Sequence, residues 1–509
     1  MIVKHLLLLL PLLSAFAAGA LEAPAIFGDH MVLQRGIPVR VWGKAEPGSA
    51  VTVSFAGKRA ETKAASDGRW QAELPPFETP GGPHSMTVSG DGKTLTFKDV
   101  LIGDVYLCAG QSNMELPLKD SENGKAEVAA SDYPDIRLFR VHRVAAYERT
   151  GELYPKPWRP CSPATSGWFS AVGYFFGREI HRELGIPVGL IDASWGGVAI
   201  SPYLPRERLG SDPDFAPILE RYARARAHMT PEKSAEYEKK LKEWEAARTS
   251  NPSLKRPEAP WGRSQFHPGT LYDGMIDPLA PFGLKGVLWY QGEANAVRAR
   301  QYRKLLPLLI ESWRERWGRP ELPFLIVQLP NYRGQPGSVP PPEPCWAELR
   351  EAQARALATP HTALAVTVDL GEAEDIHPKN KKEAGRRLAL AAFGLVYGKP
   401  GLFSGPVFRN AEFRDGKAEL AFDHAEGLEA RNPPLNNFEI AGTDRRFRPA
   451  NAEIRGGTVV VSSPEVPSPA AVRYCWENNP EHCNLYNRAG LPAMPFRTDD
   501  WPGVTDDRK

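Results

Sequence analysis

The segment Val105-Tyr106-Leu107-Cys108-Ala109-Gly110-Gln111-Ser112-Asn113-Met114 joins an apolar run to a polar turn. The apolar half predicts a buried strand, and the half from Gly110 onward predicts a tight turn at its end. The turn exposes the Ser112 hydroxyl between a glycine, which permits close backbone approach, and Asn113, which can donate hydrogen bonds. A nucleophilic serine needs a hydroxyl that is exposed in this way, at a turn where the backbone can approach a substrate closely. Turn and helix-cap serines share the pattern, so the interpretation depends on the rest of the chain.

Further apolar runs predict strands that are covered on both faces, and helical patterns lie between them. The strand runs are residues 188–193, 286–290 and 324–329, and the helical patterns are 170–184 and 300–317. We expect an α/β fold over residues 101–405, with a parallel sheet flanked by helices and an active site at the carboxyl ends of its strands. Ser112, the Gly196-Gly197 pair and residues 291–295 each follow such an end.

Short β-type runs separated by glycine-rich turns occupy both flanks of this region. Residues 21–100 predict a small antiparallel sandwich that serves as a scaffold, and residues 406–475 predict a second β domain. The tail at 476–509 is rich in Asn and Pro and is expected to pack on the catalytic domain. Accessory β-sandwich units are therefore expected before and after the α/β domain.

A charged segment interrupts the α/β region at about residues 228–260. Its first part is dense in Lys and Glu, and its second part is rich in proline. This composition predicts a solvated helix and a linker inserted into the catalytic domain.

The N-terminus has the features of a secretory signal peptide over residues 1–20. A short basic start precedes an apolar core from Leu6 to Phe16, and Ala18-Gly19-Ala20 offers small residues at a cleavage position. The core is too short to span a membrane, and no later run approaches the required length. We expect a secreted or periplasmic protein with no membrane contact after cleavage.

Charge and cysteine content exclude several classes of partner. The 509 residues carry 63 basic and 61 acidic side chains, a net charge of +2, which gives no field for binding nucleic acid. The five cysteines are too few for a disulfide scaffold, although Cys475 and Cys483 are close enough for a local bridge. Cys108 is expected to be a core residue, and no Cys or His pair has zinc-site spacing. We expect a small-molecule or neutral ligand and no metal.

Three other segments can complete a hydrolase with Ser112. In Ser194-Trp195-Gly196-Gly197, the glycines leave N–H groups that can face a developing oxyanion. In Trp289-Tyr290-Gln291-Gly292-Glu293-Ala294-Asn295, the amides of Gln291 and Asn295 can donate to the same oxygen. In Glu374-Asp375-Ile376-His377-Pro378, a histidine has two carboxylates beside it.

His377 is expected to act as the base that takes the Ser112 proton. Pro378 favours extended backbone at His377, and residues two apart in an extended chain face the same way. Asp375 is therefore better placed than Glu374 to hold the ring, but Glu374 remains an alternative.

These four motifs, in this order, resemble the sialate O-acetylesterase family of the SGNH-hydrolase superfamily. The likeness extends to residues 274–276, 346–350 and 484–487. It implies that Ser112 is the nucleophile and His377 the base, and that Ser112 N–H, a glycine of the 196/197 pair and the 291–295 segment form the oxyanion hole. It also implies catalysis without a metal or organic cofactor. From the same motifs, Gln111, Asn113, Trp195 and Glu293 are expected to bind substrate.

Two departures from the family pattern matter. The family usually continues Thr-x-Ile-Glu-x-Trp after Ser-Trp-Gly-Gly, whereas this chain has Val198-Ala199-Ile200-Ser201-Pro202-Tyr203. The lost threonine and glutamate leave the identity of the sugar open. The superfamily's usual carboxylate lies three residues before the histidine, which is Glu374 here, so its role stays open beside that of Asp375.

The expected function is a secreted serine esterase that removes O-acetyl groups from a carbohydrate through an acetyl-serine intermediate. Acetylated sialic acid is the leading substrate, and acetylated plant or algal polysaccharide is the alternative. A non-catalytic carbohydrate-binding protein is the alternative of another class. A sialate pocket is expected to offer an arginine to the sugar carboxylate, and Arg350 and Arg355 are among many candidates.

Overall fold

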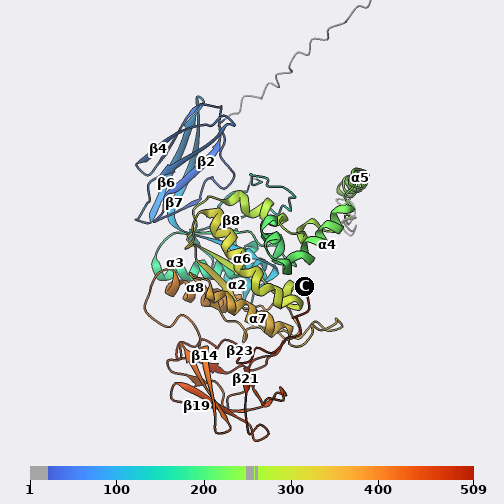
Figure 1. Cartoon of the computed structure of the whole chain (residues 1–509). Helices are drawn as coiled ribbons and strands as arrows, with labels where there is room; N and C mark the ends of the chain where they lie inside the picture. Colours follow the sequence, from blue (N-terminus) through green and yellow to red (C-terminus); the bar gives the residue numbers. More distant parts are fainter. Residues whose placement is uncertain (1–20, 155, 248–256, 258, 260–261) are drawn as a thin grey trace, which may run out of the picture.

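The computed structural model describes residues 21–154, 156–247, 257, 259 and 262–509, so the predicted signal peptide lies outside the described residues. Three parts follow one another along the molecule: an N-terminal β unit in blue, a central part of sheet and helices, and a C-terminal β unit in orange and red (Figure 1). The chain is thus a mixed α/β protein with additional antiparallel sheets, as the sequence predicted in outline.

The central sheet has the strand order β13-β12-β11-β7-β10-β8-β9. Its strands are β7 (Lys93–Gly110), β8 (Tyr133–Arg140), β9 (Arg159–Cys161), β10 (Val188–Asp192), β11 (Gly286–Tyr290), β12 (Phe324–Val327) and β13 (Thr362–Ala365). Every neighbouring pair is parallel except β8 and β9, which are antiparallel. Gly110 lies opposite Tyr290, and Cys108 lies opposite Asp192, so β7, β10 and β11 end at one edge of the sheet.

Helices cover both faces of this sheet. The main ones are α3 (Ala171–Leu184), α6 (Ala299–Trp317), α7 (Cys345–Arg355) and α8 (Lys381–Leu395). Trp289 bonds through its indole N–H to Tyr302 of α6, whereas the ring of its neighbour Tyr290 lies 5.2 Å from Nζ of Lys381 in α8. Because successive strand residues point to opposite faces, α6 and α8 lie on opposite sides of the sheet.

The N-terminal β unit shares a strand with the central sheet. The first half of β7 pairs with β6 (Gly81–Gly90), which continues to β3 (Ala50–Phe55) and β4 (Lys58–Lys63), all antiparallel. The remaining strands are β1 (Val32–Gln34), parallel to β7, and the antiparallel pair β2 (Val39–Lys44) and β5 (Arg69–Leu74). The predicted parallel sheet is therefore found as part of a mixed sheet, because β7 carries antiparallel pairing into it and β8 pairs antiparallel with β9. The predicted boundary between residues 100 and 101 falls inside β7, and the domain division stays a prediction.

The C-terminal β unit contains two four-stranded sheets and one two-stranded sheet. Their strands are β14 (Val407–Arg414), β15 (Lys417–Asp423), β20 (Thr458–Ser462) and β19 (Asn451–Arg455); β18 (Arg448–Pro449), β17 (Phe438–Ala441), β21 (Ala471–Tyr474) and β23 (Phe496–Arg497); and β16 (Glu429–Ala430) with β22 (Leu485–Tyr486). Cys475 and Cys483 form a disulfide, and Cys108, Cys161 and Cys345 are buried thiols. The tail reaches α7, where Arg497 pairs with Glu351.

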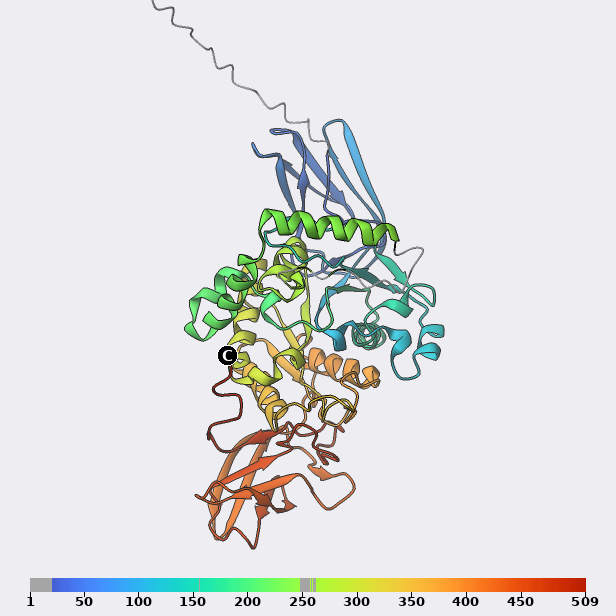
Figure 2. The same cartoon turned by 90° about the vertical axis from the view of Figure 1, so that its right-hand side faces the viewer.

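Two helices in the segment that connects β10 to β11 lie at the periphery of the molecule. They are α4 (Ala216–Ala227) and α5 (Pro231–Ala247), and α5 projects to the right in Figure 1 and toward the viewer in Figure 2. No residue of α5 is buried. Part of the predicted 228–260 insertion lies outside the described residues. Among the described residues, no helix is both long enough and apolar enough to cross a membrane.

The turn into the short helix α1 (Ser112–Glu115) depends on Gly110. Its φ of +137° is rarely adopted by residues with a side chain, and a Cβ there would lie 2.1 Å from the Tyr290 carbonyl oxygen. The same carbonyl accepts a hydrogen bond of 3.0 Å from Gln111 N–H. β7 and β11 therefore approach closely just before Ser112.

Gly110→Ala is expected to destabilise the protein by about 3 kcal/mol, because β11 must shift to admit the methyl group. The check is the apparent melting temperature compared with that of Gly210→Ala, where a Cβ meets nothing within 4 Å. Equal melting temperatures for the two variants would contradict this account of the turn.

Candidate active site

Ser112 and His377 come from segments 265 residues apart and meet at the carboxyl edge of the central sheet. Ser112 begins α1 directly after β7, and His377 precedes α8. The Ser112 Oγ lies 2.9 Å from His377 Nε2. With the ring proton on Nδ1, the hydroxyl donates to Nε2, which is the arrangement that a serine nucleophile and its base require.

Of the two candidate carboxylates, Asp375 is the one beside the histidine. Its Oδ1 accepts a 2.8 Å hydrogen bond from the His377 main-chain N–H and lies 3.7 Å from His377 Nδ1. Glu374 instead accepts from Arg333 at 3.1 Å, and its side chain is 59% exposed. Asp375 therefore fixes the histidine loop directly, whereas its contact with the ring is longer than a hydrogen bond.

The electrostatic surroundings of His377 favour its neutral form. Burial lowers the pKa of His377, the positive charge of Lys381 lowers it further, and Asp375 opposes both effects. Only a neutral ring can accept a proton. Because its pKa is lowered, His377 stays neutral at a lower pH than an ordinary histidine does.

A buried polar network joins the serine turn to the histidine loop through Asn113. The Asn113 Nδ2 donates to Glu293 Oε1 at 2.5 Å and to the Ile376 carbonyl at 2.9 Å, and its Oδ1 accepts from Lys381 Nζ. Asn113 is 0% exposed. The predicted substrate-binding role of Asn113 and Glu293 does not fit, because both side chains are buried and bonded within the protein.

The sequence interpretation missed Lys381. Burial lowers the pKa of this ammonium group to about 7, and burial raises the pKa of Glu293. Three lysines follow Pro378 closely, and only the helical spacing of Lys381 with Ala384 and Leu388 places it on the buried face of α8. That spacing is the signal that could have identified it.

A second network surrounds Gln111 and Gln291. The Gln111 Oε1 accepts from Gln291 Nε2 at 3.1 Å and from Ala294 N–H at 3.2 Å. Gln291 Nε2 also donates to Asn295 Oδ1 at 2.9 Å. The Gln111 side-chain oxygen is therefore used within the protein, and the predicted oxyanion role of Gln291 does not fit because its amide protons are used internally. Asn295 Nδ2 has no hydrogen-bond partner in the described part of the chain and remains a candidate donor.

The Gly196-Gly197 turn lies against Ser112, but its first N–H group is already bonded. A Cβ on Gly196 would lie 3.4 Å from Ser112 Cβ. Gly196 N–H donates to Glu115 Oε2 at 2.5 Å, and Arg143 pairs with the other oxygen of Glu115. Across the described residues, the N–H groups of Ser112 and Gly197 have no hydrogen-bond acceptor, so these two are placed better than Gly196 as oxyanion donors.

Residues 198–203, which depart from the family pattern, contact the serine turn through Tyr203. The Tyr203 hydroxyl lies 2.8 Å from the Gly110 carbonyl and 3.0 Å from the Ala193 carbonyl. Trp195 is partly exposed, and its ring lies 5.9 Å from the Arg143 guanidinium. Trp195 is thus the predicted substrate contact that the geometry leaves accessible.

The two arginines considered from the sequence do not face the site. Arg350 is fully buried and donates to main-chain carbonyls, including that of Glu477. Arg355 is bonded to Glu351 at 3.1 Å. Within the described residues, no group of three or more His, Cys, Asp or Glu side chains is arranged to hold a metal ion.

A cavity of about 510 Å³ opens beside the serine turn. Its lining includes Gly197, next to the glycine that contacts Ser112, and Ala294, which is bonded to Gln111. The cavity is large enough for a sugar-sized ligand, and Gly197 and Ala294 connect its wall to the serine turn.

Comparisons with known proteins identify relatives of this chain. Residues 253–393 match the family model described as carbohydrate esterase, sialic acid-specific acetylesterase. The sialate O-acetylesterase of Mus musculus is 29% identical over 533 residues, covering 96% of each chain, and that of Homo sapiens is 29% identical, covering 93% of this chain and 92% of the human chain. The crystal structure of a carbohydrate acetylesterase from Xanthomonas citri is 39% identical, with a TM-score of 0.81, and the match covers 94% of this chain and 100% of that one. The chain belongs to the carbohydrate acetylesterase family that includes the sialate O-acetylesterases.

Proposed function

We propose that this protein is an exported serine esterase that removes O-acetyl groups from sialic acid. The observation that carries the proposal is the 2.9 Å contact between Ser112 Oγ and His377 Nε2, with a cavity of about 510 Å³ beside the serine turn. The sialate substrate is taken from the names of the relatives, and the mixed sheet with its serine turn supports an SGNH-type arrangement. The Cys475–Cys483 disulfide supports export, because disulfides persist in oxidising compartments.

In the proposed reaction, Ser112 Oγ attacks the acetyl carbonyl while His377 Nε2 takes the hydroxyl proton. The carbonyl oxygen becomes an oxyanion, which accepts hydrogen bonds from Ser112 N–H, Gly197 N–H and the Asn295 amide. His377 then returns the proton to the departing sugar hydroxyl, leaving an acetyl group on Ser112. A water molecule, deprotonated by the same ring, releases acetate and restores the serine.

Asp375 acts in this scheme as a positioning residue. It holds the His377 main chain through a direct hydrogen bond, and its charge stabilises the imidazolium that forms during the reaction. Lys381 and Asn113 fix the same loop from the buried side, so the ring is oriented mainly by its backbone.

Replacing Ser112 by alanine is expected to abolish acetate release while the protein stays folded, because the nucleophile is lost and no buried contact is removed. The measurement is acetate release from 4-nitrophenyl acetate, with the melting temperature as a control for folding. A folded Ser112→Ala protein with wild-type activity would exclude the assignment.

The pH dependence of kcat/KM follows from the lowered pKa of His377. The ring must be neutral to act as a base, so activity is kept above its pKa and lost as pH falls through it. Because burial and Lys381 lower that pKa, we expect the midpoint of the acid limb below about 6.5, the value of an unperturbed histidine. An uncharged aryl acetate is the substrate, so that the pH dependence reports groups of the enzyme alone. A midpoint above about 6.5 would contradict this assignment of the base.

Asp375→Asn and Glu374→Gln separate the two carboxylates. We expect Asp375→Asn to reduce kcat, but by less than the roughly 10⁴-fold loss seen where a carboxylate bonds the ring directly, since Asp375 lies 3.7 Å from Nδ1. Glu374→Gln should retain wild-type kcat, because within the described residues the Glu374 side chain is exposed and bonds to Arg333 on the surface. The measurement is steady-state kinetics of both variants, and a larger loss for Glu374→Gln would reverse the assignment.

A further inference from the structure

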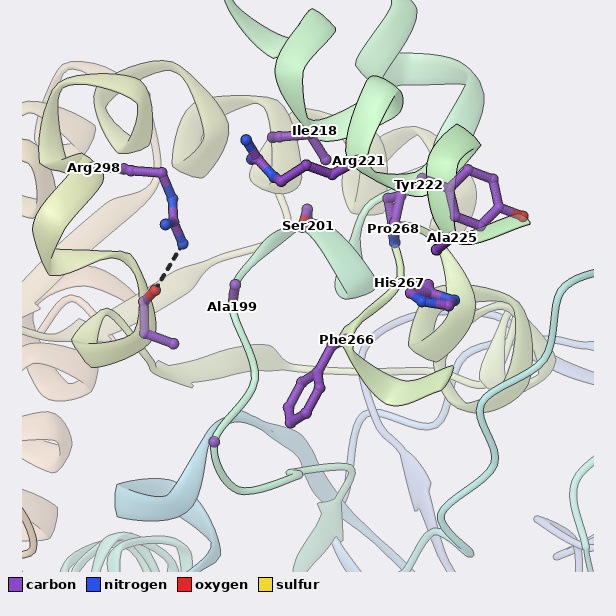
Figure 3. A pocket seen from close by; sticks show the side chains of 12 residues that line it. Ala199, Ser201, Ile218, Arg221, Tyr222, Ala225, Phe266, His267, Pro268 and Arg298 are labelled. Atoms are coloured by element: carbon purple, nitrogen blue, oxygen red, sulfur yellow. Dashed lines mark hydrogen bonds between the residues drawn. The ribbon is translucent and has the colours of Figure 1, made fainter. Parts of the chain in front are cut away.

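The cavity beside Ser112 carries positive charge that no acidic side chain of its lining balances. Its described lining contains Arg221 and Arg298, and neither Asp nor Glu. Figure 3 shows Arg298 reaching toward Ala199 from one side of the cavity and Arg221 extending over Ser201 from the other. Both arginines therefore border the cavity that opens beside the serine turn.

Of the two arginines, Arg298 lies closer in sequence to the motif beside Ser112, and its charge has no carboxylate partner in the described part of the chain. It ends the 3₁₀ helix Glu293–Arg298, which begins in the Gln291–Asn295 motif beside Ser112. Its guanidinium makes a single hydrogen bond, of 3.2 Å, to the Ala294 carbonyl (dashed in Figure 3), and no carboxylate side chain lies within 4.0 Å in the described part of the chain. Burial and the charge of Arg221 lower the pKa of Arg298, so an anion between the two groups would relieve an unfavourable arrangement.

Arg221 approaches from α4 on the opposite side. Its guanidinium donates to the main-chain oxygen of Lys509 at 3.2 Å, and it has no ion pair with an Asp or Glu side chain among the described residues. Its remaining donors are available to a ligand, since a guanidinium carries five N–H groups.

The rest of the cavity suits a sugar ring. Phe266 is 46% exposed and lines the cavity, so it offers an aromatic surface to a ligand. Ser201 occupies the position where the family it resembles usually has glutamate. This side of the cavity therefore lacks the carboxylate that could pair with the arginines.

We propose that Arg298, assisted by Arg221, binds the carboxylate of an acidic O-acetylated sugar while the acetyl group lies at Ser112. This inference rests on the proposed esterase function and adds the feature that separates acidic from neutral substrates. A guanidinium pairs with a carboxylate through two parallel hydrogen bonds, which gives orientation as well as affinity.

The test compares two sugars that differ only in charge: O-acetylated N-acetylneuraminic acid and its methyl ester. Acetate release gives the ratio of kcat/KM for the acid to that for the ester. We expect Arg298→Gln to lower this ratio by about tenfold to a hundredfold, through KM rather than kcat, because a charge-assisted hydrogen bond is lost. Arg298→Lys should retain part of the ratio, and Arg221→Gln should lower it less than Arg298→Gln does.

Arg300→Gln is the matched control, since Arg300 lies two residues along on the exposed face of α6 and should keep the wild-type ratio. An unchanged ratio in Arg298→Gln would overturn the inference. Calorimetric titration with deacetylated N-acetylneuraminic acid separates this failure from that of the proposed function. Binding that Arg298→Gln weakens, in an enzyme that releases no acetate from either sugar, overturns only the esterase proposal and supports the carboxylate site.

Discussion

One buried amide constrains the whole site. Asn113 follows the serine in sequence, and its side chain bonds to the loop after β11 through Glu293, to the histidine loop through the Ile376 carbonyl, and to α8 through Lys381. A buried amide left without these partners would cost a large desolvation penalty, so the three segments are held in one arrangement. The contact between Ser112 and His377 follows from this arrangement, because Asn113 holds the serine turn and the histidine loop next to each other.

Much of the fold was predictable because its strands are continuously apolar. The runs at 188–193, 286–290 and 324–329 became β10, β11 and β12, and the helical patterns became α3 and α6. The continuity of β7 from the N-terminal unit into the central sheet was not predictable. Its first seven residues alternate between exposed and partly buried, whereas the rest are fully buried, so the pattern changes within one strand. In a sequence, such a change of pattern looks like a domain boundary even where a single strand continues through it.

The proximity of Ser112 and His377 was predictable from the sequence, but the roles of their neighbours were less so. Ser112 lies in the turn after β7 and His377 in the loop before α8, and the adjacent Gly110 and Pro378 restrict the backbone at these places. Gln111, Asn113, Glu293 and Gln291 were assigned to substrate or oxyanion from the same motifs, but the structure uses them to join loops. An amide or carboxylate that holds two loops together has the same sequence signature as one that binds a ligand. Only the burial of these side chains, set by the tertiary packing, separates the two cases.

The central claim is that Ser112 is activated by His377 as a nucleophile. The most direct measurement is the reaction of the whole protein with a fluorophosphonate, followed by mass spectrometry of its proteolytic peptides. The account predicts a single adduct on Ser112, and its absence in the His377→Ala variant. An adduct on another serine, or equal labelling of Ser112 without the histidine, would contradict it.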